Sequence, residues 1–373
     1  MRGTRRKQMH YQNERTSGCR ISDAWTYRGL KTVILENESI KVTVLADKGA
    51  DIYEFIHKPT DTDFMWRTPT GVRDPRKFIP TTGWPDGIWH DVYEGGWQTL
   101  APTGGSPMNY AGAEIGQHSE ATTMPWDVQV LEDTPETVSA KFWVRTYRTP
   151  FYIEKTLTIN ADESVLHVEE SIVNEAEESS DAVWGQHIAL GAPFLSDGCR
   201  LDIPGGDYWV PGEGAMDTRR LSSGQTGSWP MATGSEGSEV DLHTIPAKSA
   251  RVQDYMSFMD LSEGWYAVTN PERGVGFAFQ FPADVYTHLW YWQVFGGGSG
   301  YPYYRRTYNV GLEPFTSLPN GQPRPGSAEP TSIKLAAGER RTISMKAIAY
   351  VPPNGFQGVK TVGDAGGVEF EAG

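Results

Sequence analysis

Short segments in which apolar and polar residues alternate recur along this chain, and they constrain its fold more than any other feature. Such segments lie at 30–35, 40–45, 126–131, 138–147, 151–159 and 165–173. Alternation with a period of two places one face of a strand on a core, and turn residues between the segments favour antiparallel neighbours. Helical periodicity is nearly absent. The pattern predicts an all-β protein built as a large antiparallel β-sandwich.

The chain length allows either two average domains or one large all-β domain, since 373 residues fit both. No linker, heptad or repeat divides the sequence. We therefore predict an N-terminal arm at 1–20, a single β-sandwich domain at 21–352 and a C-terminal tail at 353–373. Residues 67–117 are rich in Pro, Gly and Trp and show little periodicity. Long irregular segments inside compact domains are usually functional or mobile, so we expect this one to form a wall of a cleft.

The charge balance excludes some classes of partner. Lys and Arg total 33 and Asp and Glu total 47, a formal net charge of −14. Such a surface repels nucleic acid and anionic membranes, so we predict neither as a partner. No apolar run approaches the roughly 20 residues of a membrane helix, and no apolar segment follows the basic start. Two cysteines make no disulfide framework. These features predict a cytoplasmic protein.

Several common catalytic motifs are missing from the sequence. There is no glycine-rich phosphate loop, no Cys-x-x-Cys, no His-Glu-x-x-His and no Gly-x-Ser-x-Gly. The eight histidines do not fall at metal-ligand spacing. We therefore predict no cofactor and no metal, which leaves histidine and carboxylate acid–base chemistry.

His187 and Glu313 are the candidates for that chemistry. His187 lies among apolar and small residues, where it is either a core histidine or a functional one, and the same two interpretations apply to His118. Glu313 is more informative, because a carboxylate among apolar residues is costly to bury unless it is paired or functional. Trp290 and Trp292 share one face of a strand, as a sugar-stacking platform or as a core pair.

Together these residues resemble the aldose 1-epimerase (galactose mutarotase) superfamily over about residues 25–350. The resemblance rests on the order and spacing of several motifs: Ala46–Ile52, Gly95–Gln98, Gly116–Glu120, Gln186–His187, Leu289–Gln293 and Gly311–Pro314. The chain departs from the galactose mutarotase pattern, since the Asn-Arg pair expected before His118 is missing and Ile188-Ala189 follows His187. It looks closer to the divergent branches of the superfamily.

The resemblance implies a galactose mutarotase-like β-supersandwich, a small-molecule sugar substrate and a catalytic pair of His187 and Glu313. Glu313 would take the proton of the anomeric hydroxyl while His187 protonates the ring oxygen. The expected substrate-binding residues are His118, Gln186, Asp260, Trp290, Trp292 and Gln98. A non-catalytic carbohydrate-binding protein and a carbohydrate-active hydrolase or lyase remain as alternatives. The pair Arg305-Arg306 could bind an anionic sugar, but adjacent strand residues point to opposite faces, so we expect an unphosphorylated sugar.

Overall fold

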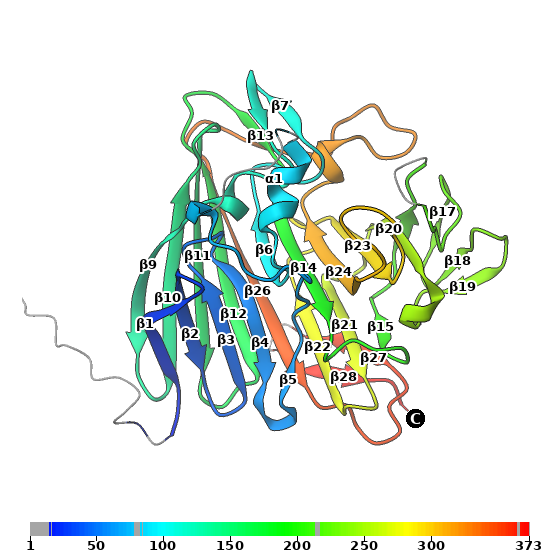
Figure 1. Cartoon of the computed structure of the whole chain (residues 1–373), viewed down its shortest axis with the longest axis horizontal. Coiled ribbons are helices and arrows are strands. Elements are labelled where there is room, and N and C mark those ends of the chain that lie inside the picture. The colour runs from blue at the N-terminus through cyan, green and yellow to red at the C-terminus, as the bar shows by residue number, and fades with distance from the viewer. Residues whose placement is uncertain are drawn as a thin grey trace, which may run out of the picture.

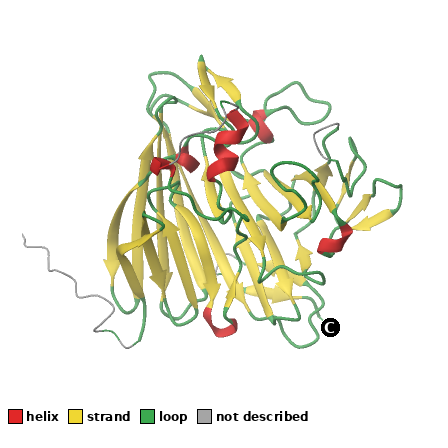
Figure 2. Ribbon diagram, viewed as in Figure 1, coloured by secondary structure: helices red, strands yellow, loops and turns green. Residues whose placement is uncertain are grey.

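Two large antiparallel sheets face each other in the computed structural model and enclose the main core (Figures 1 and 2). The structure describes residues 15, 17–77, 83, 85–212, 217–363 and 366–372, and the side chains of 85–87 are not described. Every pair of named strands within these ranges is antiparallel. The predicted fold class is confirmed.

The larger sheet has 12 strands in the order β1-β2-β3-β4-β6-β14-β24-β23-β20-β16-β17, with β5 paired to β4. Its strands are β1 Arg20–Tyr27, β2 Leu30–Glu36, β3 Ile40–Leu45, β4 Asp51–His57, β5 Thr62–Asp63, β6 Trp97–Leu100, β14 Gly185–Gly191, β16 Asp207–Trp209, β17 Thr226–Ser228, β20 Val252–Met259, β23 His288–Phe295 and β24 Tyr308–Phe315. The order brings β14 and β24, far apart in sequence, side by side at its centre.

The smaller sheet has eight strands in the order β15-β21-β22-β26-β12-β11-β10-β9. Its strands are β9 Asp127–Asp133, β10 Thr137–Arg145, β11 Phe151–Asn160, β12 Val165–Asn174, β15 Arg200–Asp202, β21 Trp265–Asn270, β22 Val275–Gln280 and β26 Arg340–Tyr350. Strand β11 shows how the alternation builds the sandwich, since every second residue from Phe151 is buried. Period-two alternation thus turns one face of this strand to the core.

Four two-stranded pairs and several short helices decorate the sandwich. The pairs are β7 Met108–Tyr110 with β8 Ala113–Ile115, β13 Ser180–Ala182 with β25 Ile333–Leu335, β18 Met231–Thr233 with β19 Glu239–Asp241, and β27 Val359–Val362 with β28 Val368–Phe370. The helices are α1 Pro85–Val92 and the 3₁₀ turns η2 Lys58–Thr60, η3 Pro75–Lys77, η4 Ala121–Thr123, η5 Lys248–Ala250 and η6 Pro319–Gly321. None of the helices in the described ranges is long and apolar enough to cross a membrane.

The structure bears on the two chain ends and on the irregular segment. Residues 1–14 and 16 of the expected arm lie outside the described residues. The expected tail contains the β27–β28 hairpin, whose Val359 and Val362 are buried against the smaller sheet. Within the irregular segment 67–117, α1 forms where the sequence suggested no helix. The predicted domain boundaries stay predictions.

Candidate active site

Neighbouring strands of the larger sheet place the candidate pair on one face. His187 on β14 is opposite Gln98 on β6, and Trp290 on β23 is opposite Glu313 on β24. The β14–β24 register pairs Gly185 with Phe315 and Ala189 with Gly311, so His187 and Glu313 fall opposite each other between these two pairs. Directly opposed residues of antiparallel strands project from the same face of a sheet.

The two side chains come close together in a shielded position. His187 Nε2 lies 3.5 Å from Glu313 Oε1, and the side chains are only 4% and 3% exposed. Gly311 makes room for the carboxyl group, because a Cβ atom there would lie 2.4 Å from Glu313 Oε1. The sequence-predicted pair is therefore an actual pair in the fold.

A cavity of about 520 Å³ opens onto this pair. Its walls are mainly aromatic and include Trp66, Trp89, Tyr93, Trp290, Trp292 and Tyr303. Helix α1 and the residues after it supply Trp89 and Tyr93, so the irregular segment does line the cavity. Flat apolar faces combined with N–H and O–H groups suit the C–H face and hydroxyl rim of a sugar.

Aromatic rings surround the His187 imidazole. The ring centroids of Trp89, Tyr93 and Trp292 lie 5.8, 5.4 and 5.7 Å from its own. The His118 ring is 5.5 Å away and contacts Trp89 edge-on at 4.5 Å. These rings exclude water from the imidazole and hold it in place.

Burial sets the protonation of the pair. It lowers the pKa of His187 from 6.5 to about 3, and it raises the pKa of Glu313 well above its usual 4.5. A buried site disfavours the charged form of each group. The sequence-based mechanism starts from an ionised Glu313 and a protonated His187. In the protein alone, burial instead favours a neutral imidazole and a protonated carboxyl group.

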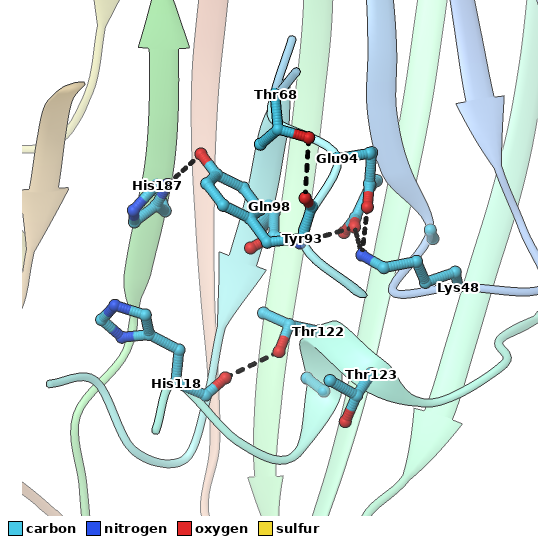
Figure 3. Close-up of polar contacts among 12 residues, drawn as sticks. Lys48, Thr68, Tyr93, Glu94, Gln98, His118, Thr122, Thr123 and His187 are labelled. Atoms are coloured by element: carbon cyan, nitrogen blue, oxygen red, sulfur yellow. Dashed lines mark hydrogen bonds and ion pairs between the residues drawn. The ribbon is translucent and has the colours of Figure 1, made fainter. Parts of the chain in front are cut away.

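His118 also lines the cavity. The backbone N–H of Gly105 donates to its Nδ1 over 3.0 Å, so the proton of the neutral ring lies on Nε2. Burial lowers the pKa of His118 well below 6.5, with His187 and His90 adding to the effect. Thr122 Oγ1 donates to the His118 carbonyl over 2.7 Å and fixes the backbone (Figure 3).

Three predicted substrate-binding residues lie outside the cavity. Because side chains alternate along a strand, Gln186 points to the opposite face of the sheet from His187. There its Oε1 accepts a hydrogen bond from Trp97 Nε1, and its Nε2 donates one to Glu170. Gln98 shares the face of His187 but does not line the cavity, and its Nε2 donates to Asp51 over 2.7 Å.

Asp260 is the third residue, and its exposed side chain pairs with Arg324 at 2.9 Å. By contrast His118, Trp290 and Trp292 do line the cavity. Their contact with substrate stays a prediction.

Sequence reasoning missed Trp66, Trp89 and Tyr93. The spacing of Trp89 and Tyr93, four residues apart, places both on one side of α1 and its end, and Pro85 at the start of α1 is a helix-start signal. Sequence reasoning also assigned no role to Lys48. Its Nζ lies 2.6 Å from Asp51 Oδ2 and 2.7 Å from Glu94 Oε2. Figure 3 shows the pairing of Lys48 with Glu94, beside Tyr93.

Metal binding finds no support in the part of the chain that the structure describes. No group of three or more His, Cys, Asp or Glu side chains there is placed to hold an ion.

A family model described as a domain of unknown function, DUF4432, matches residues 27–348. No curated protein matches the sequence. The fold resembles solved structures of galactose mutarotase-like proteins at low identity. A candidate aldose 1-epimerase from Klebsiella pneumoniae has 16% identity, covers 90% of this chain and 85% of its own, and has a TM-score of 0.70.

Two further structures agree. A galactose mutarotase-like protein from Clostridium acetobutylicum shares 15% identity over 90% of this chain and 99% of its own, with a TM-score of 0.59. A galactose mutarotase-like protein from Lactobacillus casei shares 17% identity over 86% of this chain and 100% of its own, with a TM-score of 0.55. These likenesses show a galactose mutarotase-like fold.

Proposed function

Because this chain belongs to the DUF4432 family of unknown function, we propose its function from its site: it is an aldose 1-epimerase-like enzyme that interconverts the anomers of a small sugar. The observation that carries the proposal is the pair of His187 Nε2 and Glu313 Oε1, 3.5 Å apart at an aromatic-walled cavity. A general acid and a general base held together in this way are what ring opening requires.

Ring opening requires one proton to be removed from the anomeric hydroxyl and one to be donated to the ring oxygen. From the neutral pair, His187 Nε2 takes the proton of the anomeric hydroxyl while Glu313 gives its proton to the ring oxygen. The bond between C1 and the ring oxygen breaks, and a C1 carbonyl forms. After rotation about C1–C2, His187 returns its proton to O1 and Glu313 recovers its proton from the ring oxygen.

The pair ends this cycle as it began, so no cofactor enters the balance. Compared with the mechanism expected from sequence, the roles of the two groups are exchanged: His187 is the base at the anomeric hydroxyl, and Glu313 is the acid at the ring oxygen. Burial supports the neutral pair as the starting state.

Exchange NMR between α and β anomers tests the proposal directly. We would screen a panel of aldohexoses, aldopentoses and deoxy sugars with wild-type protein, His187→Asn and His57→Asn. His57 is a matched control, because burial also lowers its pKa but it lies in β4 and contacts Thr60.

The expected result is enhanced exchange for at least one sugar, lost in His187→Asn and kept in His57→Asn. Sugar binding without enhanced exchange would identify a carbohydrate-binding protein instead. Cleavage of oligosaccharides in the same assay would identify a hydrolase or lyase.

A further inference from the structure

The two ring nitrogens of His187 have different partners. Nε2 lies 3.5 Å from Glu313 Oε1. Nδ1 lies 3.4 Å from the hydroxyl group of Tyr93 (Figure 3). The proposed proton transfers occur at Nε2. A residue that controls Nδ1 therefore controls which nitrogen is available for chemistry.

The chemistry fixes what Nδ1 must carry. An imidazole that accepts and returns a proton at Nε2 passes between a neutral ring and an imidazolium ring. Nδ1 holds a proton in both of these states, so its partner must be an acceptor throughout. A phenol oxygen can accept this hydrogen bond. Burial raises the pKa of Tyr93 well above its usual 10, so the phenol stays un-ionised and adds no charge.

We propose that Tyr93 is a positioning residue that accepts the Nδ1–H hydrogen bond of His187 and so keeps Nε2 free to exchange protons. This inference rests on the proposed function, since it assigns Tyr93 a part in the same reaction.

Tyr93 is itself held in place from both sides. Its N–H donates to the Trp89 carbonyl over 2.9 Å, and its carbonyl accepts from Thr68 Oγ1 over 3.1 Å. Its ring stacks on Trp89 with centroids 4.3 Å apart and planes 20° apart. The hydroxyl group therefore has a defined position relative to His187.

The next residue anchors this arrangement to the sheet. Glu94 pairs with Lys48 at 2.7 Å, and Lys48 also pairs with Asp51 at 2.6 Å; all three side chains are at most 1% exposed. Burial raises the pKa of Glu94 well above 4.5. A protonated Glu94 beside a paired Lys48 and Asp51 lets this cluster be buried without a net charge.

The turn after Glu94 leaves no room for adjustment. Gly95 has φ +97°, and a Cβ atom there would lie 2.2 Å from the Trp66 carbonyl oxygen. Only glycine takes this conformation at such a close approach. The cluster and the turn together keep Tyr93 at the cavity.

The tautomer of His187 tests the proposal without any sugar. We would measure the ¹⁵N shifts of the histidine rings at pH 7 in wild-type protein, Tyr93→Phe and Tyr350→Phe, with His187→Asn to assign the signal. Tyr350→Phe is the matched control, because its buried hydroxyl contacts Thr269 at 2.6 Å, away from the cavity. It also measures the effect of losing a buried hydroxyl on folding.

We expect His187 to carry its proton on Nδ1 in wild-type protein and in Tyr350→Phe. In Tyr93→Phe, part of the population should move to the Nε2–H tautomer. A wild-type ring with an unprotonated Nδ1, or a Tyr93→Phe ring identical to wild type, would overturn the proposal.

Kinetics provide the second measurement. For a sugar that the wild-type protein interconverts, Tyr93→Phe should lower kcat by roughly 10- to 100-fold, as expected for loss of an orienting partner, and change KM little. An unchanged kcat would also overturn the proposal. Since the NMR arm needs no turnover, a chain that holds the predicted tautomer but interconverts no sugar would contradict the proposed function alone.

Discussion

His187 and Glu313 lie on adjacent central strands with Nε2 and Oε1 3.5 Å apart, and both side chains are almost fully buried. Neither group can exchange a proton without affecting the other. Burial disfavours the charged form of each group, so both are neutral in the protein alone.

Glu313→Gln should remove one member of the pair with little change in shape. We expect anomer interconversion to fall by at least about 10²-fold while sugar affinity is largely kept, since a general acid or base contributes on the order of 10²–10⁴-fold. Exchange NMR measures the rate, and calorimetry measures the affinity. Normal turnover in this variant would remove Glu313 from the mechanism.

The pH dependence follows from the single proton on the pair. Burial lowers the pKa of His187 to about 3, so a second proton adds only as the pH falls toward that value. The remaining proton leaves as the pH rises through the pKa of Glu313, which lies well above 4.5. Activity should thus be retained as the pH drops through 6.5, the ordinary histidine value.

We would measure exchange rates from pH 4 upward, with circular dichroism to confirm that the protein stays folded. A loss of rate as the pH falls through about 6.5, in protein that stays folded, would contradict a neutral resting His187.

The sequence could predict the strands and the pair, but only part of the cavity. Period-two alternation identified β2, β3 and β9–β12 because each strand has one buried face. The same rule, applied to Gln186 beside His187, would have turned Gln186 away from the cavity. The approach of Tyr93 to His187 was beyond reach, because it depends on the path of the irregular segment through the fold, and local pattern says nothing of that path.

Trp290 and Trp292 should differ in what they contribute. Trp290 stacks on Phe315 with centroids 3.7 Å apart, and its Nε1 donates to the Ser317 carbonyl, so it packs as a core residue. Trp292 is only partly buried and contacts His187 and Trp66. Trp292→Ala should weaken sugar binding by roughly 0.5–3 kcal/mol.

Trp290→Ala should instead lower the free energy of unfolding by about 3–5 kcal/mol, as expected for loss of a buried indole. Denaturant unfolding and calorimetric titration of both variants separate these effects. Equal losses of affinity without a loss of stability in Trp290→Ala would show that both indoles serve the ligand.

Lys48→Met should be severely destabilising. It removes the cation that pairs with both Asp51 and Glu94, and loss of one partner from a buried ion pair costs about 3–5 kcal/mol. Lys31→Met is the matched control, because Lys31 pairs with Asp23 at 3.4 Å with both side chains partly exposed. Such surface pairs contribute about 0–1 kcal/mol. Similar unfolding midpoints for the two variants would contradict the role of the Lys48 cluster.

The charge of the preferred sugar depends on the arginines near the cavity. Arg306 lines it and Arg305 does not, although both residues lie in the turn before β24 and not on a strand as the sequence suggested. Arg73 also lines the cavity, but its Nη1 donates to the Asp91 carbonyl over 3.2 Å, and the Asp91 side chain lies at the same cavity. Arg306 is exposed, and a single exposed arginine binds an anion weakly. The net charge of −14 further disfavours an anionic ligand.

We therefore expect an unphosphorylated sugar to be preferred. The measurement compares kcat/KM for a hexose and its 6-phosphate at two ionic strengths, in wild-type protein, Arg306→Ala and Arg305→Ala. Arg305→Ala is the control, since it removes an equal charge outside the cavity. The prediction fails if the phosphate is preferred tenfold or more, and if that preference weakens with salt and disappears in Arg306→Ala alone. That outcome would assign the chain to sugar phosphates and make Arg306 the anion-binding residue, because only a charge at the cavity could produce it.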